Sequence, residues 1–383
     1  MIATAQRIQQ VEEYYFSRKL REIRELIAQG KPIINLGIGS PDLPPDEKVR
    51  QALVEAISEP KAFSYQSYQG IPTLTESFME FVKNEFAVGK GLECMPLQGS
   101  KKGITDISLA FLNPDEEALI PNPGYPTYAA VTRLAGGKSI YYSLSEVNNW
   151  LPSIEELEGL VTEKTKIMWI NYPHMPTGAS PEKDALQQVV DFCIDNHILL
   201  VNDNPYAHIL TEKAFSIFQL KGAEKIGIEL HSMSKTFNMA GCRIGFAVAK
   251  KELLNAITKV STQMESGMFL PQQEAAIAVL KAPTKWIENL NMTYAKRREL
   301  VWQLCDVLGI EYTKNTGGLF VWAKLPEGKN AEEWSDEVLY KHNFFITPGT
   351  VFGSNGEGYV RFSLCQNESE FATCIQRVKE QEL

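Results

Sequence analysis

The chain has 383 residues, of which 44% are hydrophobic and 22% charged, and its formal net charge is −9 at pH 7. This composition is typical of a folded globular protein, and the length predicts two domains. The negative charge argues against nucleic acid as a partner, because phosphate backbones are bound by clustered lysine and arginine. The six cysteines form no CxxC pair and the five histidines show no metal-ligand spacing, so we expect neither a disulfide framework nor a metal site.

The first 31 residues are polar and contain no apolar core of a secretory signal. No apolar run in the sequence is long enough to span a membrane. We therefore expect a cytoplasmic protein without a membrane partner. Residues 8–29 predict an amphipathic helix that ends at Gly30, with Pro32 just beyond it.

From about residue 95 the sequence alternates between short apolar runs and helical patterns. The expected strands are 118–120, 166–171, 198–201, 228–231 and 243–249. One expected helix spans 100–112, and a second is expected to begin at Ser180-Pro181-Glu182, with Ser180 as its N-cap. This alternation predicts an α/β fold with a large, doubly wound, mostly parallel sheet that has helices on both faces. Ligands of such sheets gather at the carboxyl ends of the strands.

After about residue 283 the pattern changes. A long charged helix around 293–306 is followed by the apolar run 317–322, a turn at 347–349 and a strand at 359–363. We interpret this part as a smaller α+β domain to which the N-terminal segment returns. The predicted division is an N-terminal arm of the small domain at 1–45, a large domain at 46–282, and a small C-terminal domain at 283–383.

Three side chains stand at the ends of expected strands in a chemically informative order. Asp203 closes the run 198–201, Lys235 follows the run 228–231, and Arg243 comes eight residues later. A lysine can hold an aldehyde cofactor as a Schiff base, an acid can hold a pyridinium nitrogen, and an arginine can hold a phosphate. Alone, Lys235 would be read as a solvated surface lysine and Asp203 as an ordinary loop acid. Together they point to pyridoxal-phosphate chemistry.

In the order and spacing of these motifs the chain resembles the fold-type I pyridoxal-phosphate enzymes of the class I and II aminotransferase family, the aspartate aminotransferase superfamily. The resemblance extends from Gly39 to Arg361. The runs 99–104 and 121–128 are most similar to the diaminopimelate aminotransferase branch. The resemblance implies a cytoplasmic enzyme of amino-acid biosynthesis that moves an amino group between an L-amino acid and a 2-oxo acid. The large domain would bind the cofactor, pyridoxal 5'-phosphate.

The resemblance also implies the roles of the residues around the cofactor ring. Lys235 would form the Schiff base and later move the substrate proton, and Asp203 would pair with the ring nitrogen. Tyr206 would donate to the phenolic oxygen of the ring. Tyr125, in Asn122-Pro123-Gly124-Tyr125, would stack on the ring, although a core tyrosine after a turn is the competing interpretation.

The cofactor phosphate would lie at the start of the expected helix 100–112, because free N–H groups at a helix N-terminus favour an anion. Ser100 and Lys101 would supply donors there. The resemblance implies that Ser232, Ser234 and Arg243 complete the phosphate site. It further implies that Tyr65 reaches the phosphate of the neighbouring subunit, with Tyr68 as the alternative, so we expect a homodimer with shared active sites.

The substrate carboxylate would bind to Arg361, whose planar guanidinium matches a carboxylate with two hydrogen bonds. A structural salt bridge is the competing role for Arg361. Gly39 would let the backbone approach the same carboxylate.

One position departs from the family pattern. Where the family has an asparagine that donates to the phenolic oxygen of the cofactor, this chain has Met175, in the run His174-Met175-Pro176-Thr177-Gly178. A thioether cannot donate a hydrogen bond. Either the site works with one donor fewer, or His174 or Asn171 takes over that role.

Three rival functions compete with this interpretation. A carbon–sulfur lyase or another elimination enzyme of the same fold would share the lysine, aspartate and arginine. A non-enzymatic regulator of this fold would carry an added DNA-binding domain, for which the acidic chain has no room before Gly39. A phosphate-binding protein would not need Asp203 and Lys235 together.

Overall fold

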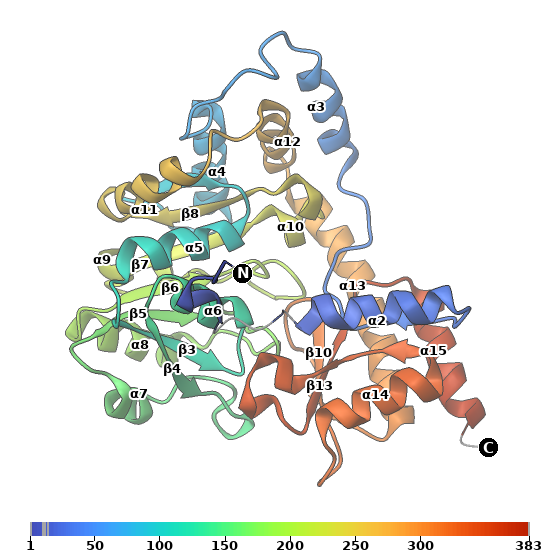
Figure 1. Cartoon of the computed structure of the whole chain (residues 1–383). Helices are drawn as coiled ribbons and strands as arrows, with labels where there is room; N and C mark the ends of the chain where they lie inside the picture. Colours follow the sequence, from blue (N-terminus) through green and yellow to red (C-terminus); the bar gives the residue numbers. More distant parts are fainter. Residues whose placement is uncertain (1, 10–12, 14, 382–383) are drawn as a thin grey trace.

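The computed structural model describes residues 2–9, 13 and 15–381, and its centre is a seven-stranded sheet (Figure 1). In spatial order its strands are β2 (Glu93–Leu97), β8 (Gly245–Ala249), β7 (Gly227–Ser232), β6 (Leu199–Asp203), β5 (Thr165–Ile170), β3 (Glu117–Asn122) and β4 (Lys138–Ser143). β8 runs antiparallel to both of its neighbours, and the other strand pairs are parallel. The predicted α/β fold with a mostly parallel sheet is confirmed.

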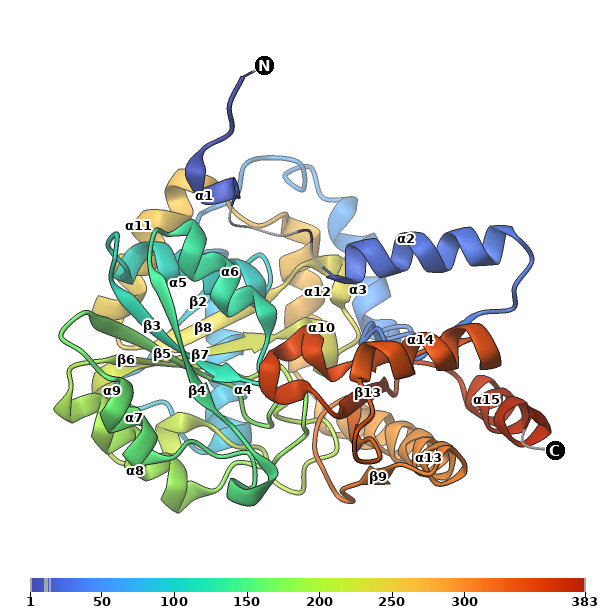
Figure 2. The same cartoon turned by 60° about the horizontal axis from the view of Figure 1, so that its bottom comes forward.

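Helices cover both faces of this sheet (Figure 2). One face carries α5 (Ser100–Phe111), α6 (Pro126–Leu134) and α11 (Lys251–Met264). The opposite face carries α7 (Ile154–Leu160), α8 (Lys183–Asp195) and α9 (Ala223–Ile226). Successive residues of β6 alternate between the two layers: Leu199 and Val201 pack on the first, and Leu200 on the second. Burial on both faces explains why the strand reads as a continuous apolar run.

Four further helices belong to this part of the chain. They are α3 (Glu47–Ile57), α4 (Pro72–Phe86), α10 (Met233–Thr236) and α12 (Leu270–Leu280). α3 packs against α12 at the top of Figure 1. Phe78 of α4 stacks on Phe246 of β8 with a centroid distance of 4.1 Å, which fixes α4 against the sheet.

A four-stranded antiparallel sheet organises the C-terminal part. Its spatial order is β12 (Thr347–Pro348), β13 (Tyr359–Ser363), β10 (Phe320–Lys324) and β9 (Glu311–Tyr312). The helices around it are α13 (Thr284–Leu308), α14 (Ala331–His342) and α15 (Glu368–Gln381). Short 3₁₀ turns connect elements in both parts: η1 (Glu146–Asn148), η2 (Ile217–Gln219), η3 (Ala240–Cys242), η4 (Gly349–Phe352) and η5 (Ser354–Gly356).

The N-terminal segment joins this C-terminal part. It contains α1 (Gln6–Gln9), α2 (Tyr15–Ala28) and β1 (Ile34–Asn35). β1 pairs in parallel with β11 (Phe344–Phe345), and Phe16 of α2 lies in the same apolar core as β10 and β13. α2 lies beside the C-terminal helices in Figure 2. The domain boundaries after residues 45 and 282 stay a prediction.

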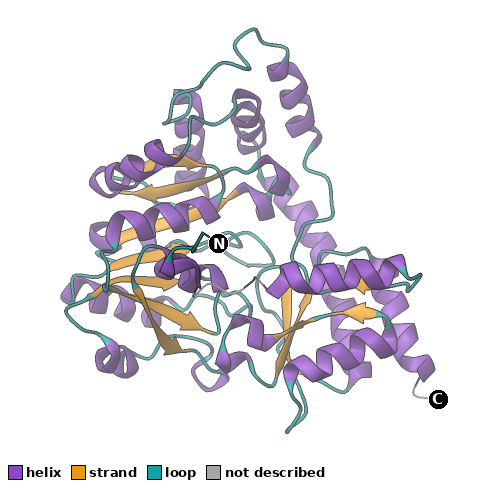
Figure 3. Cartoon of the chain, in the orientation of Figure 1, coloured by secondary structure: helices purple, strands orange, loops and turns teal. Residues whose placement is uncertain are grey.

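Three expected helix limits differ from the structure (Figure 3). The helix expected around 293–306 is α13, which begins nine residues earlier, at Thr284, and ends at Leu308. The helix expected at 8–29 is two helices, α1 and α2, with Glu13 outside both, and residues 10–12 and 14 lie outside the described residues. The helix expected from Ser180 begins at Lys183, and Ser180 is not its N-cap. Gly317 N donates to Gly178 O at 2.8 Å, so a tertiary contact holds the loop that precedes the helix.

Within the described ranges, no helix combines the length and the apolar character needed to cross a membrane.

Candidate active site

A cavity of about 450 Å³ lies between the carboxyl ends of β6 and β7 and the four-stranded sheet. Every predicted site residue except Tyr65 lines it. These residues are Gly39, Ser100, Lys101, Tyr125, Asp203, Tyr206, Ser232, Ser234, Lys235, Arg243 and Arg361. Residues more than 300 positions apart in the sequence are therefore brought to one place.

Asp203 ends β6 and is buried in the wall of the cavity. Its Oδ2 accepts a hydrogen bond of 3.0 Å from the Tyr128 hydroxyl, whereas its Oδ1 has no hydrogen-bond partner. Burial raises the pKa of Asp203 to about 7, and the Tyr128 bond only partly opposes this effect. A buried carboxylate oxygen without a partner fits the protonated ring nitrogen of pyridoxal phosphate, which would supply both a proton and a positive charge.

Lys235 lies in α10, directly after β7. Its Nζ donates a hydrogen bond of 2.6 Å to the carbonyl of Gly39. Burial lowers the pKa of Lys235, the nearby charges of Arg361 and Arg243 lower it further, and Cys365 opposes them. A lowered pKa favours the neutral amine, which is the form that attacks an aldehyde.

The start of α5 and Arg243 form the basic end of the cavity. α5 begins at Ser100 with Gly99 as its N-cap, so its first N–H groups are free to bind an anion. A Cβ at position 99 would overlap Nη2 of Arg243, so only glycine allows the guanidinium to lie this close to the helix start. Ser232 caps α10 by accepting a hydrogen bond from Ser234 N at 3.2 Å. These groups fit a phosphate.

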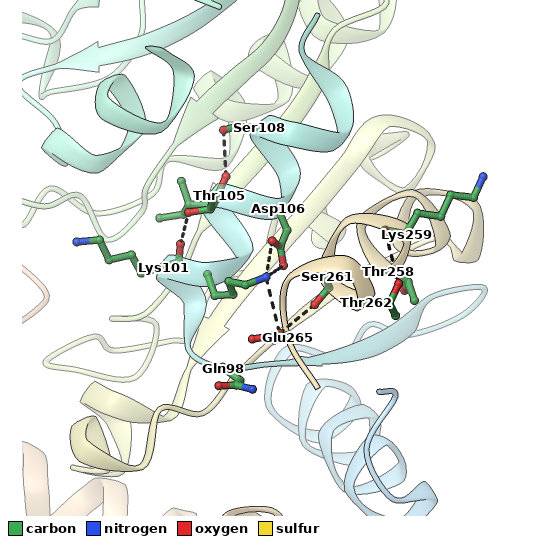
Figure 4. Close-up of polar contacts among 12 residues, drawn as sticks. Gln98, Lys101, Thr105, Asp106, Ser108, Thr258, Lys259, Ser261, Thr262 and Glu265 are labelled. Atoms are coloured by element: carbon green, nitrogen blue, oxygen red, sulfur yellow. Dashed lines mark hydrogen bonds and ion pairs between the residues drawn. The ribbon is translucent and has the colours of Figure 1, made fainter. Parts of the chain in front are cut away.

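An ion cluster holds the first turns of α5 against α11 (Figure 4). Lys102 Nζ lies 2.5 Å from Asp106 Oδ1 and 3.7 Å from Glu265 Oε1. Ser261 Oγ donates to Glu265 at 2.9 Å. Lys101 points away from this cluster in Figure 4 and lines the cavity instead. Adjacent lysines therefore lie on different sides of the helix start: Lys102 anchors the helix, and Lys101 lines the cavity.

Arg361, at the centre of β13, lies at the other end of the cavity. Its Nη2 donates to Gly37 O at 2.8 Å, and its Nη1 lies 3.3 Å from the Met175 sulfur. The guanidinium carbon lies 3.8 Å from the ring centroid of Phe320 and 4.5 Å from that of Phe352. Aromatic faces on a guanidinium stabilise its charge and fix its plane.

Gly39 is required by the same packing. A Cβ at position 39 would overlap the ring of Phe320, the ring that contacts Arg361. Any larger residue would displace this ring. Gly39 therefore helps to keep the Arg361 guanidinium in place as well as accepting a hydrogen bond from Lys235.

Asn171 and His174, the two candidate replacements for the missing donor, differ in their surroundings. The Asn171 amide donates to Asp203 O, and its Oδ1 accepts from Met175 N at 2.8 Å. His174 Nδ1 lies 2.8 Å from Thr177 Oγ1, and burial lowers the pKa of His174 to about 3. His174 is also not among the residues that line the cavity. These contacts argue against His174 as the replacement donor, whereas Asn171 lines the cavity and its amide group has a second N–H.

The tyrosines of the site differ in exposure. Tyr206 is buried, and its ring meets the ring of Phe320 edge-on at 5.8 Å. The ring of Tyr125 meets the ring of Tyr128 in the same edge-on way, with 5.6 Å between the ring centroids. Tyr65 is 92% exposed and lies outside the cavity, in the loop between α3 and α4.

Sequence reasoning did not single out nine residues that line the cavity: Phe16, Ser17, Leu20, Ile38, Tyr128, Pro205, Ala240, Phe320 and Phe352. Tyr128 could have been found, because it lies one helical turn after Tyr125 and therefore on the same side of α6. The phenylalanines carry no local pattern that separates them from other core residues, and they come from three separate elements, α2, β10 and η4.

Comparison with known proteins gives a consistent result. Residues 31–378 match the family described as “Aminotransferase class I and II”. The chain is 35% identical over 383 residues to the LL-diaminopimelate aminotransferase of Halothermothrix orenii, with 99% of this chain and 98% of that protein covered. It is equally similar to the LL-diaminopimelate aminotransferase of Aquifex aeolicus, at 35% identity with 99% of each chain covered.

Solved structures with the same architecture include the substrate-bound BacF protein of Bacillus subtilis. Its TM-score is 0.94 at 33% sequence identity, with 100% of this chain and 98% of that chain covered. A double mutant of Thermus thermophilus aspartate aminotransferase has a TM-score of 0.92 at 25% sequence identity, with 99% of this chain and 100% of that chain covered.

Proposed function

The chain belongs to the class I and II aminotransferase family, and we propose that the cavity between β6, β7 and β13 is its active site. It is a pyridoxal-phosphate-dependent aminotransferase that moves an amino group between an L-amino acid and a 2-oxo acid. The observation that carries the assignment of the site is the unpaired, buried Oδ1 of Asp203 in the same cavity as Lys235 and Arg361.

Pyridoxal phosphate, when bound, supplies a ring that accepts electrons from the bonds at the substrate α-carbon. Lys235 would bind the cofactor aldehyde through Nζ and would then carry a proton from and to the α-carbon. The lowered pKa of Lys235 supports both roles, because a neutral amine is needed to attack and to accept a proton.

Asp203 and Tyr206 would orient and polarise the cofactor. The ionised Asp203 carboxylate would hold a proton on the ring nitrogen, and Tyr128 would keep this carboxylate in place through its hydroxyl. Tyr206 would donate to the phenolic oxygen, and burial raises its pKa, so that it stays a donor at neutral pH. Tyr125 would stack on the ring.

The two ends of the cavity would bind the two anionic groups. At one end, Ser100, Lys101, Ser232, Ser234 and Arg243 would hold the phosphate. At the other end, Arg361 would bind the substrate α-carboxylate with two hydrogen bonds, and Gly39 would leave room for it.

We further propose a homodimer in which Tyr65 serves the site of the neighbouring subunit. Tyr65 is 92% exposed and follows Phe63, which is 75% exposed and whose ring lies 5.8 Å from that of Phe269. Exposed aromatic side chains that cluster on one surface indicate an interface. We propose the cytoplasm as the location, because all six cysteines are free thiols, which suits a reducing compartment.

Covalent trapping tests the site. Borohydride reduction of the holoenzyme followed by peptide mapping should label Lys235. Lys101 is the internal control, because it is the other lysine in the cavity. A label on Lys101, or no label on any lysine, would refute the proposed site. Amino donor alone should convert the cofactor spectrum and a 2-oxo acid should restore it, whereas ammonia release without an acceptor would indicate elimination.

A further inference from the structure

We propose that this active site takes amino acids with an uncharged, apolar side chain, and that Leu20 of α2 is a specificity-determining residue. This inference rests on the proposed function, in which Arg361 binds the α-carboxylate. It adds the class of the side chain, which the family membership leaves open.

The first support is the surroundings of Arg361. Rings of Phe16, Phe320 and Phe352 lie 5.8, 3.8 and 4.5 Å from its guanidinium carbon. The Met175 sulfur lies 3.3 Å from Nη1. The substrate end of the cavity is therefore walled by apolar side chains, with one guanidinium among them.

The second support is the distribution of charge. Among the described residues that line the cavity, the charged ones are Lys101, Asp203, Lys235, Arg243 and Arg361. The first four have proposed roles with the cofactor. This leaves Arg361 as the cation for the α-carboxylate, and the described residues of this subunit that line the cavity include no further cation for a carboxylate at the end of the substrate side chain.

The third support is the position of α2 and of the segment 37–39. Phe16 and Leu20 lie one turn apart on α2, so they share a face, and both line the cavity. Ile38 lies between Gly37, whose carbonyl accepts from Arg361, and Gly39, whose carbonyl accepts from Lys235. Leu20 and Ile38 thus add apolar surface to the lining of the cavity, and Ile38 lies between the two carbonyls that accept from Arg361 and Lys235.

Burial in such a wall favours an apolar side chain and penalises a charged one. An apolar group gains from leaving water, whereas a buried charge without a partner is strongly unfavourable. A substrate with a second carboxylate or ammonium would have to leave that group unpaired against Leu20, Phe16 or Ile38. We therefore expect discrimination of at least about tenfold in kcat/KM.

The test uses the holoenzyme and the half-reaction with amino donor alone, followed through the cofactor absorption. L-Leucine, L-methionine and L-phenylalanine should react with a kcat/KM at least about tenfold higher than L-aspartate, L-glutamate and LL-diaminopimelate. The opposite order would overturn the inference and leave the aminotransferase function intact. A cofactor that none of these donors converts would overturn the proposed site as well.

Variants test the role of the wall. Leu20→Arg should raise kcat/KM for L-glutamate and lower it for L-leucine, changing their ratio by about tenfold or more. Ser17→Arg also places a cation in the cavity and should have the same effect on this ratio. Because Ser17 is exposed, this substitution should not prevent folding. Ile27→Arg is the matched control, because Ile27 is 50% exposed on the same helix and does not line the cavity. An unchanged ratio in both cavity variants would overturn the role of this wall.

Discussion

At the scale of single residues, Asp203 couples cofactor binding to stability. Without cofactor its buried carboxylate has a pKa of about 7, well above the ordinary value, so the folded state binds a proton that the unfolded state releases between about pH 4 and pH 7. The stability of the cofactor-free protein should therefore fall as the pH rises through this range. Above pH 7 the full penalty of the buried charge is present.

We predict that Asp203→Asn stabilises the cofactor-free protein at pH 8, by up to about 4 kcal/mol, because the neutral amide removes this penalty. The gain should shrink as the pH falls toward 4. Thermal or urea unfolding over this range measures it, with the exposed Asp191→Asn as control. Asp203→Asn should also bind pyridoxal phosphate more weakly than the unmodified protein does. Equal stability of Asp203→Asn and the unmodified protein at pH 8 would contradict this account.

Met175 offers a second prediction at this scale. Its sulfur contacts Arg361 and cannot donate a hydrogen bond to the phenolic oxygen of a bound cofactor. Met175→Asn would add a donor, stabilise negative charge on that oxygen, and lower the pH at which the cofactor absorption changes, by a few tenths of a unit to about one unit. Met264→Asn, at a position 61% exposed, is the control. Superimposable titrations would show that another group already donates.

At the scale of elements, α5 depends on Lys102 for its position. Lys102 pairs with the fully buried side chain of Asp106, and burial raises the pKa of that carboxyl despite the ion pair. Lys102→Met would leave this carboxylate unpaired and should destabilise the protein by about 3 kcal/mol. It should also weaken cofactor affinity, because α5 begins at the phosphate end of the cavity.

A double variant shows whether Lys102→Met destabilises the protein because Asp106 loses its partner or because a positive charge is lost. Lys102→Met with Asp106→Asn removes both partners and should recover most of the stability measured by urea unfolding. Lys259→Met on α11 is the matched control, since Lys259 is exposed and lies near the same helix pair (Figure 4). A double variant no more stable than Lys102→Met alone would show that the pair does not hold α5.

At the scale of the whole molecule, the proposed dimer predicts complementation between inactive chains. If Tyr65 serves the neighbouring site, a mixed dimer of Lys235→Ala and Tyr65→Ala chains contains one intact site. Random exchange of subunits should then restore about a quarter of the unmodified activity. Lys235→Ala mixed with Arg361→Ala is the control, because both residues line one cavity of the same chain and no intact site can form. An active monomer in sedimentation would refute the shared site.

Local chemistry explains what the sequence by itself determined. The order Asp203, Lys235, Arg243 and the glycine before α5 could be interpreted, because each stands close to an apolar run whose strand character depends on nearby residues. The alternation of strand and helix predicted the doubly wound sheet, since burial on both faces requires continuous apolar runs. The exposed Tyr65 could be assigned only by resemblance.

Only the tertiary structure decided the features that depend on residues far apart in the chain. The start of α8 at Lys183 follows from the contact of Gly178 with Gly317, which no local cap can predict. The pKa of Asp203 depends on its burial, and the aromatic surroundings of Arg361 depend on Phe320 and Phe352 arriving from separate elements. Desolvation and side-chain packing are set by the whole fold, so the chemistry of the site was readable from the sequence and its apolar substrate end was not.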